Sequence, residues 1–188
     1  NTGLRAVKTM GAHRSHGWRG NLLLVRKGTV MASRQVALPG GEPRGALVVD
    51  VQFPAGPLRI VAAHLGLLRR ARTRQMKALL SAAGDDEEYP TVLMGDLNEW
   101  RLGKRSSLRA LELSFGPLQA AVPSFPAHFP VWSLDRIVAN PHSLISRIEL
   151  HDTPLARIAS DHLPIKAVVK LGKSTQLESN FVELASVA

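Results

Sequence analysis

The chain contains no cysteine, and its apolar residues never form a long uninterrupted run. The absence of cysteine excludes disulfide bonds, thiolate catalysis, cysteine-bound zinc and iron–sulfur clusters. The longest apolar runs are Leu22–Val25, Ala46–Val49 and Ile60–Ala63, far short of the roughly 20 residues that a membrane-spanning helix needs. The start of the chain has no signal-peptide pattern. We therefore expect no transmembrane segment, and these absences are compatible with a cytoplasmic protein.

Acidic residues are few compared with basic ones. Twenty-four Lys and Arg residues oppose fifteen Asp and Glu residues, which gives a net charge of +9. A basic surface attracts phosphate-bearing partners such as nucleic acid, phospholipid headgroups and small phosphoesters. An arginine-rich composition can equally serve solubility alone. The charge therefore favours phosphate-bearing partners but names no substrate.

The length and the apolar pattern indicate one domain with strands and helices. With 188 residues, of which 45% are hydrophobic, the chain can bury a sizeable core. We expect a single domain over residues 1–171 and a C-terminal tail over 172–188, either a short docking helix or a linker. The expected strands cover 21–26, 30–38, 46–53, 58–63, 92–94, 132–138, 143–150 and 165–171, and the expected helices cover 67–83 and 107–113.

The stretch Gly95-Asp96-Leu97-Asn98 directly follows one of these strands. Asp96 and Asn98 are two residues apart, so in an extended backbone both side chains leave the same face. Each needs a hydrogen-bond partner, and leaving either one dry costs about 1–3 kcal/mol. Gly, Asp and Asn are also typical of turns. Taken alone, the stretch indicates either a turn or a functional site.

Polar residues also close other apolar runs, and we expect one edge of the sheet to gather them. The four segments that carry them are Ala63-His64-Leu65, Gly95-Asp96-Leu97-Asn98, Leu134-Asp135-Arg136-Ile137 and Ser160-Asp161-His162-Leu163-Pro164. In order and wording they resemble the later signature motifs of the endonuclease/exonuclease/phosphatase superfamily. This superfamily includes DNase I-like nucleases, apurinic endonucleases, neutral sphingomyelinases and inositol-polyphosphate phosphatases. The resemblance runs from about Asn21 to Leu171.

The resemblance implies hydrolysis of a phosphoester with Mg²⁺ (or Mn²⁺) as cofactor. Asp96 would orient and deprotonate the attacking water. Asn98 would hydrogen-bond a phosphate oxygen or the nucleophile without adding repulsive charge. The Asp135 carboxylate would orient the His162 ring and favour its imidazolium form. That cation can contact the phosphoryl oxygens as negative charge builds up in the transition state.

The remaining site residues also take their roles from the resemblance. Asp161 would lie near the metal or its waters, since oxygen ligands suit Mg²⁺. His64 matches a histidine at the phosphate or the leaving group and is a candidate general acid. We add Arg101, a cation shortly after the Gly-Asp-x-Asn stretch, to Asn98 as a substrate-binding residue.

The fold that the resemblance implies is an α/β (α+β), DNase I-like, four-layer sandwich of two mixed β-sheets flanked by helices. One departure is clear, because the sequence has no Gln-Glu dipeptide, whose glutamate is the principal metal ligand in the family. Neither Glu42 nor Glu99 has the right context to replace it. Either the sequence is N-terminally shortened or the site has lost its metal, and we favour the first. We then expect an N-terminal segment or a second copy of the chain to cover the open sheet.

The leading hypothesis is therefore a magnesium-dependent phosphoester hydrolase, with weak or no metal-dependent activity in these 188 residues alone. The phenylalanine- and proline-bearing loop at 125–130 favours a non-nuclease phosphodiesterase, whereas the +9 charge favours a nuclease. The alternative hypothesis is a non-catalytic phosphate- or nucleic-acid-binding module on the same fold.

Overall fold

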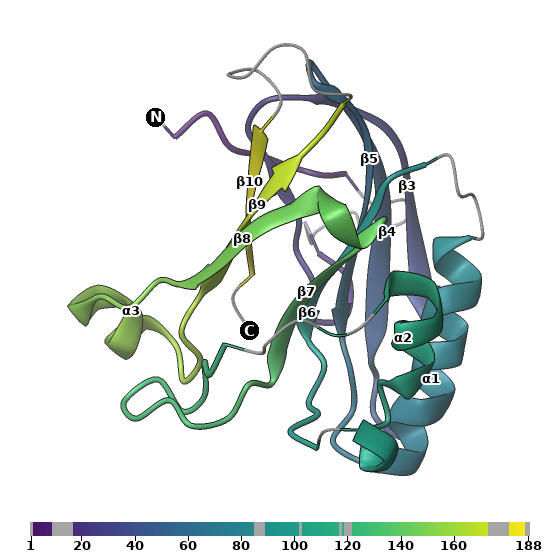
Figure 1. Cartoon of the computed structure of the whole chain (residues 1–188), viewed down its shortest axis with the longest axis vertical. Helices are drawn as coiled ribbons and strands as arrows, with labels where there is room; N and C mark the ends of the chain where they lie inside the picture. Colours follow the sequence, from purple (N-terminus) through teal and green to yellow (C-terminus); the bar gives the residue numbers. More distant parts are fainter. Residues whose placement is uncertain are drawn as a thin grey trace.

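A five-stranded sheet forms the centre of the molecule (Figure 1). The computed structural model describes residues 2–8, 17–84, 89–101, 103–116, 118, 122–172 and 181–186. The five strands are β3 (Thr29–Ala37), β4 (Gly45–Phe53), β5 (Gly56–His64), β6 (Thr91–Asp96) and β7 (Asp135–Asn140), in the spatial order β3-β4-β5-β6-β7. The β5–β6 pair is parallel and the other pairs are antiparallel, so the sheet is mixed.

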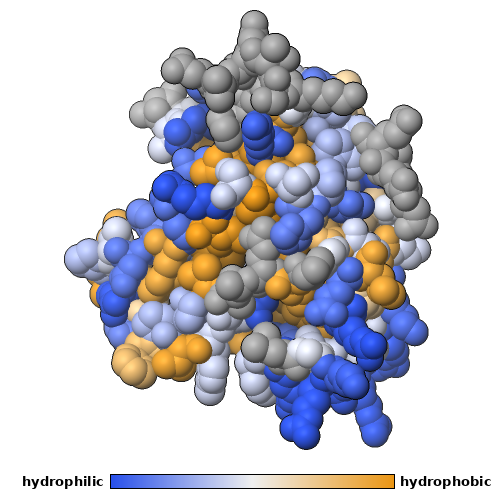
Figure 2. Space-filling model, viewed as in Figure 1, coloured by the Kyte–Doolittle hydropathy of each residue, from blue (hydrophilic) through white to orange (hydrophobic). Residues whose placement is uncertain are grey.

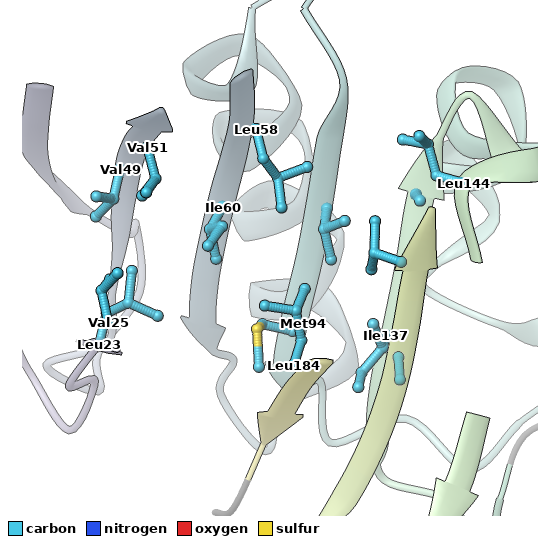
Figure 3. Packing of buried hydrophobic residues seen from close by; sticks show 14 of the residues in the cluster. Leu23, Val25, Val49, Val51, Leu58, Ile60, Met94, Ile137, Leu144 and Leu184 are labelled. Carbon is cyan, nitrogen blue, oxygen red and sulfur yellow. The ribbon is translucent and has the colours of Figure 1, made fainter. Parts of the chain in front are cut away.

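A second sheet packs against one face of the first. Its strands are β8 (Ile145–Leu150), β9 (Ile165–Lys170) and β10 (Phe181–Ser186), in the order β10-β9-β8, and both pairs are antiparallel. A two-stranded ribbon of β1 (Arg5–Ala6) and β2 (Leu24–Val25) contributes to the same core. Figure 3 shows Val49, Ile60, Met94 and Ile137 of the central sheet in one cluster with Val25, Leu144 and Leu184.

Two helices cover the opposite face of the central sheet (Figure 1). They are α1 (Arg69–Ala83), which makes the crossover between the parallel strands β5 and β6, and α2 (Arg109–Phe115). Alternation along β4 explains the two cores, because Ala46 and Val48 face the helices while Val49 and Val51 face the second sheet. The remaining helical turns are η1 (Gly103–Arg105), η2 (His142–Leu144) and α3 (Pro154–Ala159).

The two-sheet α+β fold expected from the resemblance is confirmed. The strands expected at 46–53 and 58–63 are β4 and β5, which pair as an antiparallel hairpin. The helix expected at 67–83 ends at Gly84, which adopts a positive φ of 82°. Two details differ. The second sheet is antiparallel instead of mixed, and within the described residues no helical layer covers its outer face.

The segment expected as a C-terminal tail contains a strand. Residues 181–186 form β10, which pairs along its whole length with β9, and Leu184 is buried in the core between the sheets. The alternating inward positions 182, 184 and 186 were the available signal. Glu183 and Ser186 interrupt the apolar run, which hides a strand of six residues. Residues 173–180, which precede it, lie outside the described part of the chain.

None of the helices in the described ranges is long and apolar enough to cross a bilayer.

Candidate active site

Three strand ends bring three of the expected site residues to one edge of the central sheet. His64 ends β5, Asp96 ends β6, and Asp135 begins β7. The parallel strands β5 and β6 end on the same side, and Asp96 lies directly opposite Asp135 across the antiparallel β6–β7 pair. This edge is at the lower end of the sheet in Figure 1. The edge predicted to gather these side chains therefore exists in the fold.

Gly95 allows β5 and β6 to approach closely at this edge. Its φ is 137°, a left-handed conformation that favours glycine, and an added Cβ would collide with the carbonyl oxygen of Ala63. The sequence suggested that the strand ends before Gly95, but β6 continues through Asp96. Any side chain here would push Asp96 away from His64.

Asn98 holds a tight turn directly after Asp96. Its backbone has a positive φ of 51°, and its backbone N–H donates to Oδ1 of Asp96 over 2.8 Å. Asparagine tolerates this conformation better than most residues. Its side-chain Nδ2 donates to the carbonyl oxygen of Leu65 over 2.9 Å, which ties the turn to the end of β5. The stretch is therefore a turn, and that turn fixes one oxygen of the Asp96 carboxylate.

His162 is hydrogen-bonded to Asp135. Its Nδ1 lies 2.8 Å from Oδ2 of Asp135, and the hydroxyl of Ser124 donates to the same oxygen. The backbone N–H of Leu163 donates to the carbonyl of Ser124 over 2.8 Å, so the segment carrying His162 is fastened beside Asp135. The second carboxylate oxygen of Asp135, Oδ1, is buried without a hydrogen-bond partner in the described structure. An unpaired buried carboxylate oxygen is costly and favours a positive neighbour.

The surroundings of His162 favour its protonated form. Burial opposes protonation, but the hydrogen bond to Asp135 and the negative charges of Asp135, Asp96 and Asp161 outweigh it and raise the pKa of His162. Burial likewise disfavours the charged form of Asp96, and the nearby Asp135 adds to this, so the pKa of Asp96 is raised despite the N–H bond from Asn98. The edge thus combines a ring whose pKa is raised, which favours its imidazolium form, with a carboxylate of increased basicity.

His64 has the opposite character. Nη1 of Arg44 lies 2.7 Å from Nε2 of His64, and because a guanidinium can only donate, Nε2 must accept. Burial, followed by the charge of Arg44, lowers the pKa of His64 to about 4. Glu42 holds Arg44 in place through two bonds from the guanidinium, of 3.0 and 3.1 Å. His64 is therefore neutral near pH 7, with its proton on Nδ1.

Residues 3–162 match the sequence model of the Endonuclease/Exonuclease/phosphatase family. This span is most of the chain. The chain belongs to that family. Its members are hydrolases that act on phosphoesters and generally use divalent metal ions.

Solved structures share the fold at low sequence identity. A functionally unknown conserved protein from Enterococcus faecalis is 19% identical with a TM-score of 0.67, and the match covers 80% of this chain and 71% of that one. A mannosyl-6-phosphatase from Bacteroides thetaiotaomicron is 15% identical with a TM-score of 0.62, covering 87% and 75%. TDP2 of D. rerio, solved with a single-strand DNA product, is 17% identical with a TM-score of 0.58, covering 77% and 70%. Among curated proteins the sequence has no match.

The residues present do not complete a metal site of the kind that the family uses. Within the described ranges, no three His, Asp or Glu side chains are grouped so that they could hold an ion. Glu42 is engaged with Arg44 and the backbone N–H of Leu67, and Glu99 is fully buried against Arg72. Neither glutamate is free to take the place of the missing Gln-Glu residue.

Two of the expected site residues lie at the border of the cluster. Asp161 is exposed, and its carboxylate contributes negative charge near His162. Arg101 turns toward Glu99, with Nη1 at 3.7 Å from Oε1, and its guanidinium lies over the ring of Trp100. Among the described residues, the ion-pair partner of Asp96 is His64 and that of His162 is Asp135, so Arg101 does not take part in either pair.

The sequence analysis missed two residues that shape the site, Ser124 and Arg44. Ser124 lies outside the expected strands and helices, and only the fold brings it to Asp135. Arg44 follows Pro43 in the turn before β4. The Glu-Pro-Arg triplet between glycines was the available sign that this turn carries a charged pair.

Proposed function

We propose that the chain is a phosphoester hydrolase whose phosphoryl group binds at the edge formed by His64, Asp96, Asp135 and His162. The observation that carries this proposal is the cross-strand pair of Asp96 and Asp135, with His162 hydrogen-bonded to the latter. This arrangement brings the Asp96 carboxylate, which acts as the base, and the His162 imidazolium together in a partly buried site. Hydrolysis of a phosphoester needs both groups, a base that activates the water and a cation that stabilises the phosphoryl oxygens.

In the proposed reaction, Asp96 removes a proton from the attacking water. Its Oδ1 is occupied by the Asn98 backbone N–H, which leaves Oδ2 for the water. A raised pKa makes the carboxylate a stronger base, since efficiency rises as the pKa approaches the working pH. The new phosphorus–oxygen bond forms as the bond to the leaving oxygen breaks, and that oxygen departs with the electron pair as an anion, which is nitrophenolate for bis(p-nitrophenyl) phosphate. His162, held as imidazolium by Asp135, stabilises the charge that accumulates on the phosphoryl oxygens.

We propose that His64 is not the general acid of this reaction. A neutral ring whose Nε2 accepts from Arg44 has no proton to give from that atom. We propose instead that Arg44 and His64 form one unit that binds a phosphate oxygen, with the guanidinium supplying the charge. Asn98 keeps a second N–H on Nδ2 for the same purpose, because only one donates to Leu65.

A divalent metal, Mg²⁺ or Mn²⁺, remains part of the proposal for the full reaction, where it would neutralise charge on the phosphate. Asp161 is the exposed carboxylate best suited to meet it. Because the described residues do not complete the ion's site, we predict that these 188 residues alone hydrolyse phosphodiesters slowly and respond weakly to added magnesium.

The experiment is hydrolysis of bis(p-nitrophenyl) phosphate at high protein concentration, with and without MgCl₂. The Asp96→Asn and His162→Ala variants are compared with Lys27→Gln, which changes an exposed lysine in the turn between β2 and β3. We expect slow release of nitrophenolate that falls to background in the first two variants and is unchanged in the third. Equal rates in all of the proteins would reject the site and favour a non-catalytic phosphate-binding module. A rapid magnesium-dependent rate would instead show that the metal site is complete.

A further inference from the structure

A row of aromatic rings leads from His162 to the protein surface. The ring of Phe125 lies 4.7 Å from that of His162 and stacks on Trp132 at 5.9 Å with an interplanar angle of 13°. Trp132 is followed by Trp100 at 6.4 Å. Both tryptophans are about half exposed, at 51% and 48%. Large aromatic side chains left this exposed beside the proposed site indicate a surface for a planar ligand.

Positive charge lies next to this row. Trp100 belongs to a short loop whose ends are tied together, because Glu99 accepts hydrogen bonds from both the backbone N–H and the hydroxyl of Ser107. The same loop carries three cations, Arg101, Lys104 and Arg105. The guanidinium carbon of Arg101 is 4.7 Å from the centre of the Trp100 ring. One closed loop therefore presents an exposed aromatic ring and three positive charges.

A fourth cation comes from the first turn of α1. Nε of Arg69 donates to the carbonyl oxygen of Arg105 over 3.1 Å, which brings the start of the helix against η1. The one carboxylate inside the loop, Glu99, is fully buried and engaged with Arg72 and Ser107. In Figure 2 hydrophilic side chains dominate the lower right of the view, over η1 and the start of α1. Oε1 of Glu99 also lies 3.7 Å from Nη1 of Arg101 and offsets part of its charge, so the four cations leave this surface positive overall.

We propose that this surface binds single-stranded nucleic acid, with a base stacked at Trp132 and Trp100 and the neighbouring phosphates held by the four cations. Proteins that bind single strands combine the same two features, a positively charged track and aromatic rings on which bases stack. Only the ring of Phe125 separates Trp132 from His162, so the phosphodiester next to a base at Trp132 can reach the proposed site. The inference rests on the proposed function, since it assigns the substrate class of that site.

A lipid surface is the competing partner for exposed aromatic residues. The ring arrangement favours nucleic acid, because Trp132 lies nearly parallel to Phe125 and stays about half exposed, so a base can extend the row of rings. Insertion into a membrane would be served equally well by aliphatic side chains in any orientation. The experiment therefore includes vesicles as a separate probe.

The test is binding of a fluorescently labelled ten-nucleotide deoxythymidine strand, followed by anisotropy in the Asp96→Asn background to prevent cleavage. A strand of the same length in which every base is removed carries the same phosphates without stacking. We expect the normal strand to bind about fivefold or more tightly than the abasic one, as stacking of a base contributes substantially to affinity. Trp132→Ala should abolish this preference, and Trp132→Phe should retain most of it.

The cations are tested separately. Lys104→Gln and Arg105→Gln should weaken binding of both strands by similar factors and reduce its salt dependence, whereas Lys27→Gln should leave binding unchanged. Equal affinity for the normal and abasic strands, or stronger binding to vesicles containing phosphatidylserine that Trp132→Ala abolishes, would overturn the proposal. Binding as expected without any hydrolysis by the native chain would contradict the proposed function but not this surface.

Discussion

Nη1 of Arg44 lies 2.7 Å from Nε2 of His64, which makes the histidine an acceptor at the atom that faces the site. The same ring nitrogen is 3.4 Å from Oδ2 of Asp96. A protonated His64 would attract Asp96 but would repel Arg44 at closer range. The geometry therefore fits a neutral His64, and Arg44 carries the positive charge of this pair.

Removing the guanidinium should change the titration of His64. In Arg44→Gln, the nearby charge and the competing donor are both gone, so the pKa of His64 should rise from about 4 toward 6.5 and stay below it because of burial. Arg44→Lys, which keeps the charge, should shift it less. The measurement is an NMR titration of the histidine ring protons. A native pKa near 6.5, or no rise in Arg44→Gln, would show that Arg44 does not control this ring.

The same property predicts how the stability depends on pH. The pKa of His64 is about 4 in the folded protein and about 6.5 in the unfolded chain. As the pH falls from 6.5 to 4, unfolded chains therefore bind a proton that the folded protein does not, and the free energy of unfolding decreases. This loss is on the order of 3 kcal/mol for such a difference. His64→Asn should lose less stability over this range than the native protein.

The check is urea unfolding at several pH values between 4 and 7. His151→Asn, in which an exposed histidine is changed, serves as the matched control and should follow the native curve. If the His64→Asn and native curves remained parallel over the whole range, His64 would have to titrate alike in both states.

Changing one partner of the buried pair of Arg72 and Glu99 should destabilise the protein strongly. Both side chains are fully buried, and Nη2 of Arg72 lies 3.3 Å from Oε2 of Glu99. Glu99→Gln leaves the guanidinium without a counter-charge, so the free energy of unfolding should fall by about 3–5 kcal/mol. Glu112→Gln, at an exposed position on α2, should change it by about 0.5 kcal/mol or less. The measurement is urea unfolding of both variants. Comparable losses of unfolding free energy in the two would contradict a structural role for Glu99.

Local patterns were sufficient to predict the strands of the central sheet and the long helix. Ala46–Phe53 and Leu58–Ala63 carry the apolar runs of buried strands, and the turn residues between them specify the hairpin. The strand at residues 181–186 could not be recognised in the same way. Its inward face includes Ser186, and only its partner β9 makes it a strand. Short strands whose stability depends on a distant partner leave little trace in the sequence.

The site was predictable where polar residues end apolar runs, and not where contacts come from loops. His64, Asp96 and Asp135 were visible because each stands at the end of a strand, and neighbouring strands bring such residues together. The hydrogen bond from Ser124 and the protonation of His64 depend on segments that approach only in the folded chain. The resemblance suggested a histidine that donates a proton, whereas we propose, from the Arg44 side chain beside it, that His64 accepts one hydrogen bond and stays neutral.

The central claim is that the polar residues at this edge bind a phosphoryl group, and histidine ring ¹H–¹⁵N NMR during titration with inorganic phosphate at pH 7 tests it without any need for metal or turnover. We predict that the ring signals of His162 and His64 shift with one common affinity, while those of the exposed His128, His142 and His151 do not. In Asp135→Asn the response of His162 should weaken, because its imidazolium form loses its partner. Uniform small shifts in all five rings, or none at His162, would contradict the claim.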